Sequence, residues 1–277
     1  ASDATEAAVD KATLTFTHSN WNVEQTVTIT AVDDTIGDGP VVSTVTVSVV
    51  DAESDDTWDP LPDQIVSVTT DDDDPRVVAR WVFYNNSAFD GNDPTAGVSD
   101  DMAIATDKTA LLPGETATFA NYTSYSRGIN GIMIDVANLA GAVTKDDFEF
   151  KVGNSSDPSS WDQAEAPSSV TVRPGAGEGG SDRITIIWAD KSVQKQWLQV
   201  MVLSTIRTGL SSADVFYFGN AIAESGNDSE NAQVDVSDEA GARLHPRHFL
   251  DPALVDDLYD YNRDQRVDVS DENLARQ

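Results

Sequence analysis

Residues 1–75 show apolar positions that alternate with threonine or serine. The alternation occupies residues 13–17, 26–30 and 44–49, and a further apolar run covers 65–69. A period of two places one face of a strand on a core and the other in water, which is typical of an antiparallel sheet. The segment 33–40, rich in Asp, Gly and Pro, has the composition of a turn. This part of the chain is therefore predicted to be a partial β-sandwich.

Residues 76–222 continue the strand pattern with longer apolar runs. We expect strands at 77–84, 116–120, 131–136, 147–152, 170–173, 183–189, 197–203 and 215–218, and a short turn of helix at 192–196. Gly, Pro, Asp and Asn separate the runs. Many short strands with regular breaks favour an antiparallel β-sandwich, with a jelly roll as the expected type. The order of the strands stays open.

The stretch from Asp260 to Glu272 differs from the rest because its oxygen-bearing side chains follow the spacing of a calcium loop. Calcium takes about six to eight oxygens, and a twelve-residue loop supplies them from positions 1, 3, 5, 9 and 12 and from the backbone carbonyl at position 7. Position 6 is Gln265 where Gly is usual, and position 12 is Asp rather than Glu. The expected ligands are Asp260, Asn262, Asp264, Arg266 (through its carbonyl), Asp268 and Asp271.

A second copy of this pattern lies 33 residues upstream, where Val234 to Arg243 matches Val267 to Arg276 at all but two positions. A fixed internal period indicates a duplicated unit. Carrying the register over gives a first loop with fewer charges, which we expect to bind calcium more weakly. Its predicted ligands are Asn227, Ser229, Asn231, Gln233 (through its carbonyl), Asp235 and Asp238.

Each loop is expected to lead into a helix, with Ser237 and Ser270 as N-caps. Asp251-Pro252 predicts a third helix whose apolar face carries Leu254, Val255 and Leu258. The predicted order over residues 223–277 is loop, helix, linker, helix, loop, helix.

This arrangement resembles a type I dockerin module, a small α-helical pair of EF-hand-like loops. The resemblance implies bound Ca²⁺ and a cohesin-like partner. Two alternatives stay open: the short last helix packs on the neighbouring sandwich and is only structural, or the acidic turns hold no ion. The resemblance implies partner contacts at Val236, Ser237, Arg243, Val269, Ser270 and Arg276.

Residues 14–22, residues 25–34 and the aspartate run at 71–74 resemble the later half of a Calx-beta repeat, an immunoglobulin-like sandwich. The early strands of that unit are missing, so we interpret the chain as a fragment of a longer protein. A solvated acidic linker is the alternative. The resemblance implies calcium ligands at Asp33, Asp34, Asp71, Asp72, Asp73 and Asp74.

The segment 121–131 combines aromatic and polar residues beside an apolar strand, as in sugar-binding sandwiches. Core or rim packing is the alternative. Candidate carbohydrate ligands are Tyr122, Tyr125, Arg127, Asn130 and Trp161. Residues 214–220, followed by the dockerin-like pair, resemble the C-terminal ends of large secreted proteins of the planctomycete type, and that resemblance covers residues 76–277. It implies an extracellular location.

Charge and composition limit the function further. The formal net charge of −31 argues against nucleic acid, because no basic patch exists to displace counterions from phosphates. There is no cysteine, and no apolar stretch is long enough to insert into a membrane. None of the three histidines stands in a zinc pattern, and no catalytic motif is present.

We therefore expect a non-catalytic, calcium-binding C-terminal region of a large secreted or cell-surface protein that serves attachment. The alternative is a carbohydrate-binding module that contacts a polysaccharide, and a hydrolase or lyase fragment is a third hypothesis. The expected domains are a partial Calx-beta-like repeat at 1–75, a jelly-roll-like sandwich at 76–222 and a dockerin-like module at 223–277.

Overall fold

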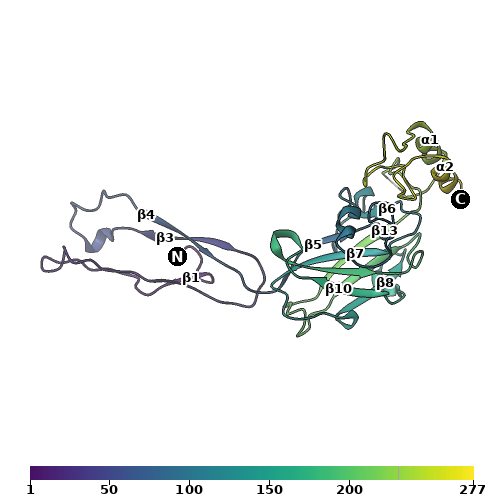
Figure 1. Ribbon diagram of the computed structural model, residues 1–277. Helices are drawn as coiled ribbons and strands as arrows, with labels where there is room; N and C mark the ends of the chain where they lie inside the picture. The colour runs from purple at the N-terminus through teal and green to yellow at the C-terminus, as the bar shows by residue number, and fades with distance from the viewer. Residues whose placement is uncertain (230) are drawn as a thin grey trace. The chain divides into compact units, whose positions relative to one another are not determined.

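The computed structural model describes residues 1–229 and 231–277, and it is mainly β (Figure 1). The chain divides into two compact units, Ala1–Asp74 and Pro75–Gln277. The predicted boundary at 75/76 lies one residue from this division. Residues 223–277, which we expected to form a domain of their own, belong to the same unit as residues 76–222. Within the described part of the chain, no helix has the length and apolar character needed to span a bilayer.

The first unit consists of two separate antiparallel pairs, with a 3₁₀ turn at Asp51–Glu53. β1 (Ala7–Val9) pairs with β2 (Ile29–Ala31), and β3 (Val41–Val47) pairs with β4 (Gln64–Thr70). The prediction of a strand at 13–17 is wrong, because these residues form no ladder with another segment. Side-chain amides of Asn20 and Gln25 donate to the Thr15 carbonyl there, at 3.2 and 2.8 Å, in place of a ladder.

Two sheets form the sandwich of the second unit. The four-stranded sheet has the order β10-β11-β7-β5 and is antiparallel throughout. The five-stranded sheet has the order β6-β13-β12-β8-β9, and only β6 and β13 are parallel. The strands are β5 (Arg76–Val82), β6 (Tyr122–Thr123), β7 (Gly131–Ala137), β8 (Phe148–Gly153), β9 (Asp162–Gln163), β10 (Ser169–Arg173), β11 (Asp182–Ile187), β12 (Trp197–Val202) and β13 (Asp214–Asn220).

Alternating residues of both sheets fill one core. Ile184 and Ile186 of β11 and Leu198 and Val200 of β12 are completely buried in a single apolar cluster. Burial of such side chains is the main favourable term for a fold of this kind. Short 3₁₀ turns connect the strands at Ser99–Ala103, Phe119–Asn121, Lys145–Asp147, Pro158–Ser160 and Glu178–Gly180.

Two local predictions in the sandwich are wrong. Residues 116–120 end in a 3₁₀ turn because the Asn121 side chain accepts a hydrogen bond from the Thr118 amide, at 2.8 Å, and so closes a capping box. Residues 192–196 are not helical. Lys191 and Lys195 have positive φ angles of 71° and 53°, which no right-handed helix contains.

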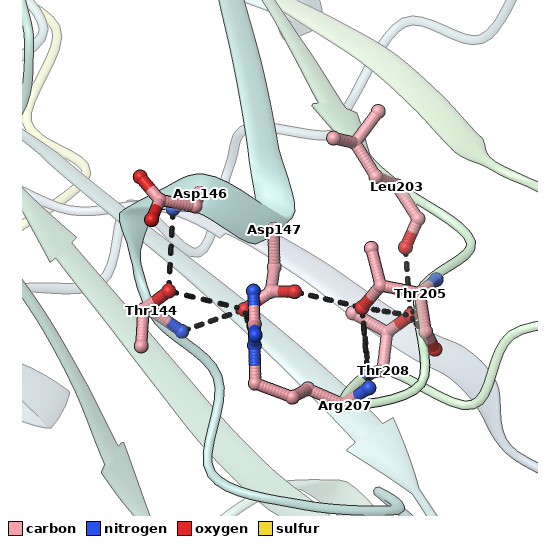
Figure 2. A network of polar contacts seen from close by, with 7 residues as sticks. All are labelled: Thr144, Asp146, Asp147, Leu203, Thr205, Arg207 and Thr208. Carbon is pink, nitrogen blue, oxygen red and sulfur yellow. Dashed lines mark hydrogen bonds and ion pairs between the residues drawn. The ribbon is translucent and has the colours of Figure 1, made fainter.

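Buried acids of the sandwich are held by specific partners. Asp147 is completely buried, and its carboxylate accepts hydrogen bonds from the Thr144 amide (2.8 Å), the Thr205 hydroxyl (2.7 Å) and Arg207 Nε (2.7 Å), as Figure 2 shows. The network fastens the start of β8 to the segment after β12. Burial by itself would raise the pKa of Asp147, but these donors hold it below its ordinary value.

The C-terminal part carries two helices, α1 (Val236–Leu244) and α2 (Val269–Ala275). Their N-caps are Asp235 and Asp268, two residues before the predicted serines, because each aspartate accepts from the serine amide at 2.7 Å. The helix predicted after Asp251-Pro252 does not form.

Only Val255 of the apolar face predicted for that third helix packs against the core of the sandwich. Leu254 and Leu258 remain 69% and 41% exposed. A short helix gains most of its stability from burying an apolar stripe, and here two of the three predicted apolar residues stay in solvent.

Candidate metal centres

The loop from Asp260 to Asp271 wraps around two completely buried carboxylates. The carboxylate oxygens of Asp260 accept hydrogen bonds from the backbone amides of Asp264 (3.1 Å) and Gln265 (2.9 Å). The carboxylate of Asp271 accepts from the amides of Tyr261 (2.8 Å) and Asp268 (3.0 Å). The first and last residues of the predicted loop thus hold its backbone in a closed turn.

Burial disfavours the charged form of both acids. Burial raises the pKa of Asp260 to about 7, although the charge of Arg263 acts in the opposite direction. Burial also raises the pKa of Asp271 to about 6, against the backbone amides that donate to it. A bound divalent ion would stabilise the charged form of both groups.

The remaining predicted ligands of this loop lie nearer the surface. Asn262 is half-buried and donates from Nδ2 to Asp264 Oδ2 at 3.2 Å. Asp264, Arg266 and Asp268 are exposed, and Asp268 also caps α2. Gln265 has φ of 69°, so position 6 keeps the left-handed turn for which Gly is usual.

Arg263, at position 4 of the loop, anchors the loop in the sandwich. It is 2% exposed, and its Nη2 donates to the Tyr84 hydroxyl at 3.0 Å and the Ser124 hydroxyl at 3.1 Å. The guanidinium also lies 4.3 Å from the centre of the Tyr84 ring, a cation–π contact. The Ala88 amide donates to the Arg263 carbonyl at 2.9 Å. The spacing of the predicted calcium ligands did not indicate that Arg263 would anchor the loop.

The first loop has a different register from the predicted one. Asp238 is completely buried and accepts from the Ser225 amide at 2.9 Å, as Asp271 accepts from Tyr261. Ser225 therefore corresponds to Tyr261, and Glu224 corresponds to Asp260. Glu224 is completely buried, and its Oε2 has no hydrogen-bond partner in the part of the chain that the structure describes. The sequence comparison missed Glu224 because three extra residues follow it and break the 33-residue period.

The other predicted ligands of the first loop are exposed. Asn227, predicted as position 1, donates to Asp235 Oδ1 at 3.3 Å. Asn231 donates to Asp228 Oδ2 at 2.6 Å and accepts from the Gln233 amide at 2.9 Å. The structure thus brings Asn227 and Asp235 together and leaves Ser229 at the surface.

A separate acidic cluster lies in the first unit. Asp33, Asp73 and Asp74 offer carboxylate oxygens within 4.8 Å of one another, the only such triple in the described residues. They border a cavity of about 30 Å³ that Asp34, Asp71 and Asp72 also line. Glu6 lines the same cavity and is 9% exposed. Burial, then the charges of Asp38 and Asp34, raise its pKa. Sequence reasoning did not single out Glu6.

The predicted partner-binding residues surround the starts and ends of the two helices. Val236 and Val269 are 80% and 64% exposed, and Ser237 is exposed while Ser270 is half-buried. Arg243 donates to Glu272 at 3.1 Å, and Arg276 donates to Glu239 at 2.8 Å. These reciprocal contacts join the C-terminal end of each helix to the first turn of the other, as a duplicated unit with approximate two-fold symmetry would.

The residues predicted to bind carbohydrate do not form an exposed platform. Tyr125 and Asn130 are completely buried, and both donate to the Asn85 carbonyl, at 3.1 and 2.8 Å. Tyr122 is 7% exposed. Arg127 and Trp161 are half-buried, and Arg127 pairs with Asp190 at 2.9 Å. The rings of Tyr122 and Tyr125 are packed in the interior and present no exposed face on which a sugar could stack.

A larger cavity of about 1090 Å³ lies between the sandwich and the first loop. Its lining includes Trp197, Gln194 and Asn154 from the sandwich and Asn231 and Gln233 from the loop. Comparison with known proteins offers no precedent for any of these sites, since no protein-family model matches the chain and neither a curated protein nor a solved structure shows significant similarity to it.

Proposed function

We propose that this chain is a non-catalytic, calcium-binding region of a secreted or cell-surface protein that serves attachment through its C-terminal loop pair. One observation supports this most: Asp260 and Asp271, at opposite ends of a twelve-residue loop, are completely buried, and within residues 1–229 and 231–277 they receive hydrogen bonds from backbone amides alone. A hard divalent cation is the partner that such an oxygen-lined loop accommodates.

In this proposal the loop pair is a permanently filled clamp rather than a sensor. Arg263 and the Ala88 contact join the second loop to the sandwich, so an ion bound there would order the surface that α1 and α2 present. The exposed Val236 and Val269 would face a cohesin-like partner. The finer fold assignments, a jelly roll and a dockerin-like pair, belong to this proposal.

Calorimetric titration of calcium into the full chain tests the proposal. Asp260→Asn should weaken the tightest binding event at least about tenfold, the equivalent of about 1.4 kcal/mol. Asp256→Asn replaces an exposed acid of the same segment and should leave the titration unchanged. Equal isotherms for wild type and Asp260→Asn would remove the basis of the proposal.

Carbohydrate binding is a second candidate, favoured by the cavity that Trp197, Asn154 and Gln194 line. Aromatic faces and amide groups in one concave site suit a sugar ring. A glycan array probed with the full chain and with Trp197→Ala tests it. A signal lost in the variant would support this function, and a silent array would eliminate it.

A further inference from the structure

Two buried acids of the sandwich lack the partners that its other buried acids have. Asp135 accepts from Arg183 Nε, and Asp147 accepts from Arg207 Nε, each at 2.7 Å. An arginine thus neutralises each of these two carboxylates. A buried carboxylate without a cation is strongly unfavourable, so any exception needs a physical explanation.

Asp90 and Asp100 are the exceptions, and they are 3% and 0% exposed. Oδ1 of Asp90 accepts from the amides of Ser87 (2.9 Å) and Asn92 (3.0 Å), and Oδ2 of Asp100 accepts from the Gly97 amide (2.9 Å). The other oxygen of each carboxylate is buried and has no hydrogen-bond partner among the described residues. No lysine or arginine of residues 1–229 and 231–277 forms an ion pair with either acid.

The two acids act on each other electrostatically. Both lie in the connection between β5 and β6, with Asp100 in the 3₁₀ turn Ser99–Ala103. Burial is the largest cause that raises the pKa of Asp100, to about 6, and the charge of Asp90 adds to it. Arg173 opposes this effect only from a distance, because its Nη1 donates to Asp101 at 2.9 Å instead.

We propose that Asp90 and Asp100 form a further calcium site inside the sandwich, with Oδ2 of Asp90 and Oδ1 of Asp100 as its carboxylate ligands. Backbone carbonyls of the connection and water would complete the coordination shell. Two carboxylates with no histidine or cysteine suit a hard cation of this kind and not zinc. The ligands of this site are separate from the predicted ligands of the C-terminal loops.

An ion at this position would support the docking of the second C-terminal loop. It would hold the turn 87–92, and Ala88 in that turn donates to the Arg263 carbonyl and accepts from Gln265 Nε2 at 3.4 Å. The sandwich ion and the Arg263 anchor therefore act on neighbouring residues of one turn. Loss of the ion would loosen the surface against which the loop packs.

Calcium stoichiometry of variants tests the site. Asp90→Asn and Asp100→Asn should each lower the calcium bound in equilibrium dialysis by about one ion per chain, while Asp260→Asn lowers it independently. Asp147→Asn, a matched buried acid with an arginine partner, should keep the wild-type number. In chelator, Asp100→Asn should melt at or above the wild-type temperature, because it removes an uncompensated buried charge.

If Asp90→Asn and Asp100→Asn retain the wild-type calcium content and calcium-induced rise in melting temperature, the two acids share a proton instead and the proposal fails. Crystals of the wild-type chain grown with a lanthanide chloride keep the test valid where the variants do not fold. An anomalous peak between the two carboxylates supports the site. A peak at Asp260 with none between Asp90 and Asp100 overturns it and leaves the C-terminal loop proposal standing.

Discussion

Nη2 of Arg263 lies 3.0 Å from the hydroxyl oxygen of Tyr84, so a residue of the second loop is fixed to the connection after β5. Residues 223–277 therefore share one compact unit with the sandwich. This contact packs the second loop on the sandwich, and it leaves the exposed Val236 and Val269 of α1 and α2 in solvent.

Replacement of Arg263 should detach the loop from the sandwich. Arg263→Ala removes hydrogen bonds from a buried charge to Tyr84 and Ser124, which should lower the free energy of unfolding by roughly 2–4 kcal/mol. Urea denaturation measures the loss, and limited proteolysis should release the C-terminal segment. Arg266→Ala, an exposed residue of the same loop, serves as the control. Equal stability of the two variants would contradict the anchoring role.

The register of the first loop gives a second prediction. Glu224→Gln should abolish calcium binding at this loop, because Glu224 occupies the place that Asp260 has in the second loop. Asn227→Ala changes the residue that sequence comparison put at position 1, and it should weaken binding much less. Calorimetry on the Asp260→Asn background isolates the first loop. If Asn227→Ala weakened calcium binding more than Glu224→Gln did, position 1 of the first loop would be Asn227, as the 33-residue period predicts.

The Asp135–Arg183 pair predicts an acid-dependent loss of stability. Burial alone would raise the pKa of Asp135, but hydrogen bonds from Arg183, Trp81 and the Glu178 amide lower it below its ordinary value. A lowered pKa in the folded state stabilises the protein above the unfolded value, about 3.9, and the contribution disappears as the pH falls further. Melting temperature measured from pH 5 downwards should fall more steeply for wild type than for Asp135→Asn. If the melting temperatures of the two proteins fell in parallel with pH, the Asp135–Arg183 pair would contribute nothing to the pH dependence of stability.

Sequence patterns predicted those elements that form through interactions between residues close together in the sequence. The apolar run at Gly131–Ala137 forms β7, and ligand spacing identified Asp260 and Asp271, which the structure buries together. Residues 116–120 show the limit of such patterns, since the Asn121 side chain turned a strand-like segment into a 3₁₀ turn.

Other features depend on contacts that no short stretch contains. Arg263 is buried because Tyr84 and Ser124, far away in the sequence, accept its hydrogen bonds. Glu224 escaped notice because three additional residues separate it from the repeat. The unpartnered oxygens of Asp90 and Asp100 become visible only once the connection that carries them is folded.

The most direct test of the central claim is a crystal structure of the chain grown with calcium. We expect an ion in the Asp260–Asp271 loop, bound by about six or seven oxygens at about 2.4 Å that include both carboxylates. An unchanged loop at saturating calcium, in which the two carboxylates keep only their backbone amide donors and no ion is present, would contradict it.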